Sequence, residues 1–190
     1  MDGLGIMEMT LKGENNSVNE KLRYIFENVN NWLTFAEAKN GALIAINISI
    51  IVGFFTTIEY YINNWIVVFL LIMISISLFF AIISFVPLTG NMAEKRLEFW
   101  SDRSIAQKNL YLYSYIAKYK LNETEYKRYL DDIAMDCEIT DYICKNDDVY
   151  LAQEIIYNSK IVLRKYKLFE IAITIFAISV IIFAVAIIIA

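Results

Sequence analysis

The chain has 190 residues, 58% of them apolar, and a formal net charge of −4. This apolar share exceeds the roughly 45–50% of soluble proteins and is gathered into three runs, which argues against a soluble globule. There is no His, so the commonest metal ligand and the usual proton shuttle near neutral pH are missing. The near balance of charge also argues against binding a nucleic acid polymer.

The first forty residues precede the first apolar run. Residues 1–16 show no sustained hydrophobic period, which predicts a disordered N-terminus. Ser17 and Glu20 match a capping box and predict that a helix starts there. Along 17–40 the apolar side chains recur at steps of three and four residues and predict one amphipathic cytoplasmic helix, with the stripe Val18, Leu22, Ile25, Val29, Trp32 and Ala36.

Three apolar runs without Lys or Arg are long enough to cross a bilayer: 41–58, 65–86 and 168–190. As helices they would be about 27, 33 and 34 Å long, close to the thickness of the hydrocarbon core. About six residues join the first two runs, which predicts an antiparallel hairpin over 41–86. The predicted fold is an all-α membrane protein with three transmembrane helices, a hairpin plus a C-terminal span.

The basic residues predict the orientation of these spans. Of the seventeen Lys and Arg, four lie in 1–40, thirteen in 88–167 and none in the short link of the hairpin. The positive-inside rule therefore places the N-terminus and 88–167 in the cytoplasm and the C-terminus outside. We expect a multi-pass protein of the inner membrane.

The segment 88–167 is predicted to form a cytoplasmic helical bundle. Asn91 with Glu94 predicts a helix over about 92–106, and Asn122 with Glu125 predicts a second one. The letters "KNDD" at 145–148 predict a turn. From Asp148 onward helical spacing continues up to the third span, along Ala152, Ile155, Ser159, Val162, Tyr166 and Phe169.

Motifs of catalysis are missing from the sequence. It contains no Gly-rich phosphate loop, no nucleophile elbow and no His-containing metal motif, so we expect neither an enzyme nor a cofactor. Cys137 and Cys144 lie in the predicted cytoplasmic part, where a disulfide is disfavoured, and two thiols alone make a poor zinc site. We interpret both as packing residues.

The stretch "FAEAKNGALIAIN" at 35–47 places charges directly beside the first span. Glu37 and Lys39 are two residues apart, so they do not face each other on a helix. Either Glu37 stays in water while Lys39 reaches the lipid phosphates, or they pair near the third span, with Lys165, Lys167 or Glu170. Asn47 either forms a hydrogen bond to another helix or lines a pore.

The run from Ala36 to Leu43, followed by Asn47, resembles the "A-D-x-K-A…L…N" signature at the first span of transmembrane Pycsar effectors. The letters "SFVP" at the end of the second span and "AQEIIYNSKIVLRKYKLFE" before the third are also similar to that family. The resemblance covers roughly 20–190. Glu37 stands where Asp is usual, and Asn40 where a small residue is usual. The resemblance implies that the candidate signalling residues at the membrane are Glu37, Lys39, Asn40 and Asn47.

The resemblance implies an antiphage defence effector. It would sense cyclic UMP or cyclic CMP, made by a partner cyclase, and impair the inner membrane, which causes abortive infection. Three helices cannot enclose an aqueous path alone, so a homo-oligomer is expected. The alternative is a membrane-anchored scaffold that recruits a partner and forms no pore.

A cyclic nucleotide needs an aromatic face for its base and a cation for its phosphate. The cytoplasmic part offers both kinds of side chain, and the candidates are Tyr111, Tyr115, Tyr157, Lys160, Arg164 and Lys165. The alternative for the tyrosines is packing between helices.

Overall fold

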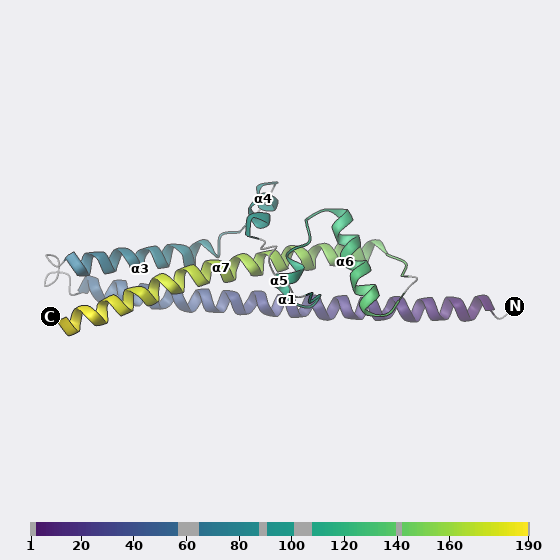
Figure 1. The fold of residues 1–190 in the computed structure, drawn as a ribbon, viewed down its shortest axis with the longest axis horizontal. Coiled ribbons are helices and arrows are strands. Elements are labelled where there is room, and N and C mark those ends of the chain that lie inside the picture. Colours follow the sequence, from purple (N-terminus) through teal and green to yellow (C-terminus); the bar gives the residue numbers. More distant parts are fainter. Residues whose placement is uncertain (1–2, 57–64, 88–90, 101–107, 140–141, 190) are drawn as a thin grey trace. The chain divides into compact units, whose positions relative to one another are not determined.

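The computed structural model describes residues 3–56, 65–87, 91–100, 108–139 and 142–189. These residues form helices and turns and include no strand, so the predicted all-α class is confirmed. The helices are α1 (Gly3–Thr56), α3 (Trp65–Ile83), α4 (Asn91–Trp100), α5 (Tyr113–Ile116), α6 (Glu123–Asp136) and α7 (Asn146–Ile189) (Figure 1).

The chain divides into two compact units. Unit 1 comprises residues 1–33 and 89–163, and unit 2 comprises residues 34–88 and 164–190. The two longest helices, α1 and α7, contribute residues to both units. The other helices each belong to one unit, with α3 in unit 2 and α4, α5 and α6 in unit 1.

Helix α1 begins earlier than its predicted cap. It starts at Gly3, so residues 3–16 are helical where disorder was predicted, and Ser17 lies inside the helix. Residues 1–2 lie outside the described part. The physical reason is that Met, Leu, Lys and Glu of this stretch are good helix formers, and extending an existing helix costs far less than nucleating one.

The core of unit 1 is built from the predicted stripes. Val18, Leu22, Ile25 and Val29 of α1 are all fully buried, as are Ala152 and Ile155 of α7. Helix α6 begins as predicted, because the Asn122 side chain accepts a hydrogen bond from the Glu125 backbone N–H at 2.9 Å. The buried Tyr129 hydroxyl donates to the Leu110 carbonyl at 3.2 Å and anchors α6 to the preceding segment.

Two helix ends differ from their predicted positions. The described part of helix α4 runs from Asn91 to Trp100, and residues 101–106 of that predicted helix lie outside the described residues. The predicted turn at 145–148 contains the first turn of α7, because the Asp148 carboxylate accepts from the Lys145 N–H at 3.3 Å and so caps the helix. Helix α3 stops at Ile83, and tight turns over 84–86 lead to Pro87, which cannot continue a helix.

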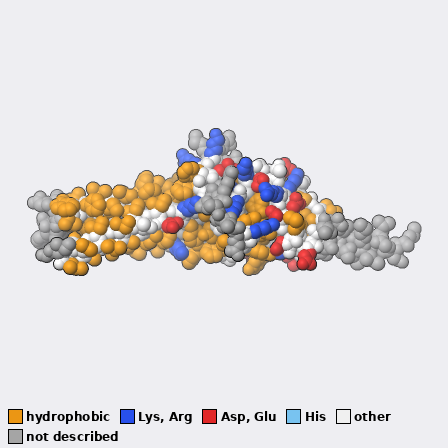
Figure 2. Space-filling view, in the orientation of Figure 1, with side chains coloured by type: hydrophobic (Ala, Val, Ile, Leu, Met, Phe, Trp, Pro, Cys, Tyr) orange, Lys and Arg blue, Asp and Glu red, His pale blue; other side chains and the backbone are white. Residues whose placement is uncertain are grey.

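Unit 2 is apolar on its outside. Among the described residues, three helices are long and apolar enough to cross a membrane: Ser17–Thr56 within α1, Trp65–Ile83, and Asn146–Ala186 within α7. Large apolar side chains such as Val52, Phe55 and Phe79 are exposed, and hydrophobic atoms cover the surface over α3 and the C-terminal part of α7 (Figure 2). Inside unit 2, Leu43, Ala81 and Ala172 form a buried cluster.

Candidate functional site

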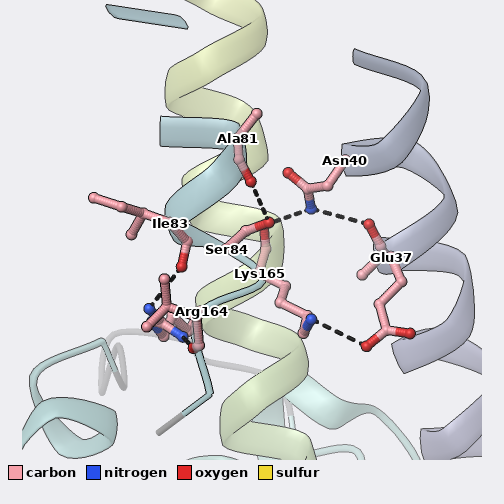
Figure 3. A network of polar contacts seen from close by, with 9 residues as sticks. Glu37, Asn40, Ala81, Ile83, Ser84, Arg164 and Lys165 are labelled. Carbon is pink, nitrogen blue, oxygen red and sulfur yellow. Dashed lines mark hydrogen bonds and ion pairs between the residues drawn. The ribbon is translucent and has the colours of Figure 1, made fainter. Parts of the chain in front are cut away.

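Polar side chains gather in unit 2 at the ends of the three apolar runs. We call Glu37, Asn40, Ser84, Arg164 and Lys165 the boundary cluster (Figure 3). Lys165 Nζ forms an ion pair with Glu37 Oε1 at 3.1 Å, and the Lys165 side chain is only 9% exposed. Of the two alternatives for Glu37, pairing with the third span is the one found. Because the ammonium group is largely out of water, its attraction to Glu37 is less screened than in a surface pair.

Arg164 and Asn40 make the remaining contacts between helices in the boundary cluster. The Arg164 guanidinium donates to the carbonyls of Ile83 at 3.0 Å and Val86 at 3.3 Å (Figure 3). The Ile83 carbonyl is the last of α3 and also accepts from the Val86 N–H at 3.2 Å, so Arg164 adds a donor from another helix to the end of α3. Asn40 is fully buried, and its Nδ2 donates to the Ala36 carbonyl at 2.9 Å and, more weakly, to the Lys165 carbonyl at 3.5 Å.

Lys39 points to aromatic rings. Its Nζ lies 4.4 Å from the ring centroid of Phe35, 5.4 Å from that of Tyr166 and 5.7 Å from that of Phe169. Rings on α1 and α7 therefore share one cation, an arrangement typically worth about 0.5–2 kcal/mol per favourable contact, depending on burial. This contact was not among the alternatives weighed from the sequence.

Asn47 connects all three apolar helices of unit 2. Its Nδ2 donates to Ser77 Oγ on α3 at 3.1 Å, and Ser77 Oγ donates to the Ala172 carbonyl on α7 at 2.9 Å. Asn47 and Ser77 are both fully buried. The predicted hydrogen bond from Asn47 to another helix is present. Ser77 was missed because the apolar run 65–86 contains three Ser, and the sequence does not show which of them faces another helix.

The six residues predicted to bind a ligand lie in different units, and several of them already contact other groups of the protein. In unit 1, Lys160 is 1% exposed and its Nζ donates to the Ala117 carbonyl at 2.7 Å. Tyr115 contacts the ring of Tyr119, and Tyr157 is half-buried on α7. In unit 2, Arg164 and Lys165 are engaged in the boundary cluster. Tyr111 lies in a hollow that the sequence did not indicate.

That hollow is an open cleft of about 450 Å³ in unit 1, lined by Lys108, Asn109, Leu110, Tyr111, Asp132, Met135 and Asp136. Two ion pairs organise its wall: Lys108 with Asp132 at 2.8 Å, and Lys21 with Asp136 at 2.6 Å. Lys21 Nζ also lies 5.4 Å from the ring centroid of Tyr111. Cations, carboxylates and an aromatic ring therefore meet around a space of the size that small ligands occupy.

The hydrogen bonds of the cleft change the acidity of its carboxylates. Hydrogen bonds from Lys21 and Tyr111 hold the pKa of Asp136 below its usual 3.8. Burial alone would raise the pKa of Asp132, but hydrogen bonds from Lys108 and Tyr119 outweigh it, and this pKa too is lowered. Both groups therefore favour the ionised form in the folded state more than in the unfolded state.

This difference predicts acid sensitivity of unit 1. Since both pKa values are lower in the folded state, their contribution to stability is complete at pH values well above 3.8 and disappears as the pH falls through the folded values. We expect the thermal midpoint in detergent, followed by circular dichroism, to drop below about pH 4. The paired variant Asp132→Asn with Asp136→Asn should be less stable at pH 7 and should lose less on acidification. An unchanged slope would contradict this assignment.

The comparisons with known proteins concern nearly the whole chain. A family model described as the Pycsar effector protein domain matches residues 21–190. The match includes the boundary cluster, the Asn47 connection and the cleft of unit 1. No curated protein and no solved structure matches the chain.

Proposed function

The chain belongs to the Pycsar effector family and is an antiphage defence effector, and we propose that it senses cyclic UMP or cyclic CMP in the cytoplasm and impairs the integrity of the inner membrane. The infected cell would stop growing or die before the phage matures, which is abortive infection. The observation that carries the membrane step is the buried connection Asn47–Ser77–Ala172 in unit 2. A simple anchor has no need of polar groups between apolar helices, where they are costly unless paired.

The proposed mode of action needs no catalysis and no cofactor. The partner cyclase supplies the nucleotide, and binding energy alone shifts the effector between an inactive and an active state. We propose that the N-terminus and 88–167 face the cytoplasm and that the C-terminus lies outside, as the distribution of Lys and Arg favours. We also propose that several copies assemble, because three helices are too few to surround an aqueous path.

We place the nucleotide at the cleft of unit 1. The Lys108 side chain is 55% exposed and can turn from Asp132 toward a phosphate oxygen. Tyr111 and Asn109 supply an aromatic ring and an amide beside it. The carboxylates of Asp132 and Asp136 can accept hydrogen bonds from a base N–H or a ribose hydroxyl. Lys160 is a weaker candidate than the sequence indicated, because a phosphate would have to replace the Ala117 carbonyl in the core.

The experiment is membrane depolarisation in cells that express the chain and receive cyclic UMP or cyclic CMP. We expect one of the two nucleotides to depolarise cells with the protein and neither to affect cells without it. Lys108→Ala should raise the nucleotide concentration needed by about tenfold, the effect of losing one charged hydrogen bond. The matched control is Lys127→Ala on α6, whose exposure of 54% and ion pair at 2.7 Å nearly equal those of Lys108. Lys127 lines a different hollow.

The outcomes separate the alternatives. If Lys127→Ala weakens the depolarisation and Lys108→Ala does not, the nucleotide binds in the hollow lined by Lys127 instead of the cleft. A folded and inserted protein that binds a partner protein and leaves the membrane potential unchanged with both nucleotides would support the scaffold alternative.

Lys39→Ala tests the contact with the aromatic rings. We expect normal insertion but weaker depolarisation, because Lys39 connects Phe35 of α1 to Tyr166 and Phe169 of α7. Lys39→Arg should retain most of the response, since a guanidinium also lies well over aromatic faces. Insertion is checked by membrane fractionation. A fully active Lys39→Ala protein would rule out a signalling role for these contacts.

A further inference from the structure

We propose that the seam where α1, α3 and α7 meet inside unit 2 becomes the lining of a water-filled path for small inorganic ions, and that Leu43 is its gate. The inference rests on the proposed membrane-impairing function and adds the residues through which ions would pass. In the structure the seam is closed, and its polar side chains are buried. When copies assemble and the seam opens, its polar groups would face the shared path.

The seam contains two polar levels in register. Asn40 and Asn47 are seven residues apart on α1, and Ser77 and Ser84 are seven residues apart on α3. Seven residues are two turns, so each pair lies on one helix face. All four side chains are at most 1% exposed. Asn47 meets Ser77 at one level, and Figure 3 shows Asn40 and Ser84 at the other.

Helix α7 follows the same spacing. Asn40 donates to the carbonyl of Lys165, and Ser77 donates to the carbonyl of Ala172, seven residues further on. Another seven residues along α7 lies Ser179, which is 1% exposed. The polar groups of three helices thus form one stripe in the interior of unit 2 and are not scattered over its surface.

The two asparagines carry unused acceptors in the closed state. Among the described residues, Asn40 Oδ1 and Asn47 Oδ1 are buried without a hydrogen-bond partner. A buried acceptor of this kind destabilises the state that contains it, typically by enough to shift an equilibrium severalfold or more. Water in an opened seam would satisfy both oxygens. The two unpaired oxygens therefore destabilise the closed seam relative to an opened seam that contains water.

An apolar layer separates the two polar levels. Leu43 lies one turn from both Asn40 and Asn47, and Ala81 lies between Ser77 and Ser84. These two residues and Ala172 form the buried cluster, in which Leu43 is the one large side chain. A narrow apolar constriction between polar segments excludes water and ions, and it is a common form of channel gate.

The lipid-facing side of the same helices provides a contrast. Ser49 and Ser75 are exposed, and each donates to a carbonyl of its own helix at 2.8 Å, that of Ala45 and Leu71 respectively. Such local bonding is how a Ser is accommodated against lipid. Asn47 and Ser77 of the seam instead bond from helix to helix, at 3.1 Å and 2.9 Å. Ser84 and Ser179 also bond to carbonyls of their own helices, but both are buried, so their polarity lies in the interior of the unit.

The first test needs no nucleotide. The purified full chain is reconstituted into vesicles loaded with potassium, and potassium leak is measured for Leu43→Ser and for Ile46→Ser. Ile46 is 47% exposed on the same helix, so the same chemical change falls on the lipid side. We expect Leu43→Ser to leak about tenfold or more faster than wild type, because a polar gate no longer excludes water. Ile46→Ser should leak like wild type.

Equal leak from both variants, or none from Leu43→Ser in correctly inserted protein, would overturn the gate. Nucleotide-induced leak in the wild type is a separate measurement. Its absence would contradict the proposed nucleotide or the membrane function. The comparison of Leu43→Ser with Ile46→Ser tests only whether Leu43 closes the seam.

The second test follows the path itself. In a chain with Cys137→Ser and Cys144→Ser, a single thiol is placed by Asn47→Cys or, as the control, by Ser75→Cys. A membrane-impermeant thiol reagent is added with and without cyclic UMP or cyclic CMP, and also in the Leu43→Ser background. We expect labelling at position 47 to rise at least about tenfold whenever the vesicles leak, and position 75 to stay unlabelled. Leak without labelling at position 47 would show that ions pass elsewhere.

Discussion

Lys160→Ala is expected to destabilise the protein by roughly 3–5 kcal/mol, among the largest effects of any single truncation in unit 1. Lys160 is 1% exposed, and its Nζ donates at 2.7 Å to the carbonyl of Ala117, which is itself fully buried. Removing the side chain leaves a cavity where the methylene stem packed, and it leaves a buried carbonyl without this donor. The two losses act in the same direction.

Chemical denaturation in detergent, followed by circular dichroism, measures this loss. Lys160→Met keeps the stem and removes only the charged donor, so we expect a smaller cost of about 1–3 kcal/mol. Lys127→Ala, an exposed Lys on α6, is the control and should leave the midpoint nearly unchanged. Near-wild-type stability of both Lys160 variants would contradict the buried position of this side chain.

Reversing one charge of the Glu37–Lys165 pair is expected to abolish most of the nucleotide-induced depolarisation. Lys165→Glu would replace the attraction to Glu37 by repulsion between two carboxylates at a partly buried position, where like charges repel strongly. Glu37 is 48% exposed, so solvent screens part of this repulsion. We still expect a loss of about tenfold or more in response, since roughly 1.4 kcal/mol suffices for it.

The exchange of both charges, Glu37→Lys with Lys165→Glu, should recover much of the response because the attraction returns with its sign reversed. Membrane fractionation and thermal midpoints accompany each variant and separate signalling from misfolding. The control is the same exchange at Glu123 and Lys127, an exposed pair on α6 at 2.7 Å, which should change neither quantity. If the double exchange is as inactive as the single reversals, the pair does not act as a unit.

Several interactions were predictable because they depend on short stretches of sequence. The hydrophobic period of α1 placed Val18, Leu22, Ile25 and Val29 in the core, where they are fully buried. The cap at Asn122 was predictable for the same reason, since its partner Glu125 lies three residues away. The predicted disorder of residues 3–16 was wrong, because a weak period does not stop a helix that is already nucleated downstream.

The partners of the charged side chains were only partly predictable. Glu37 and Lys165 are 128 positions apart in the chain, and the sequence offered Lys165, Lys167 and Glu170 as equivalent candidates for the residues near the first span. Neighbours on a helix point about 100° apart, so which of them faces α1 depends on the rotation of α7 within the packed unit. The same rotation turns Arg164 toward the carbonyls that end α3.

The sequence by itself determined that this protein is helical and that three of its segments suit a bilayer. Both follow from local period and run length, whereas for Asn47 the sequence left a bond to another helix and a pore lining as alternatives. Only the tertiary structure decided that Ser77 accepts a hydrogen bond from Asn47, that Lys39 contacts aromatic rings, and that Lys108 and Asp132 line a cleft. Such contacts join segments that are distant in the chain, and no local pattern encodes which faces of two helices will meet.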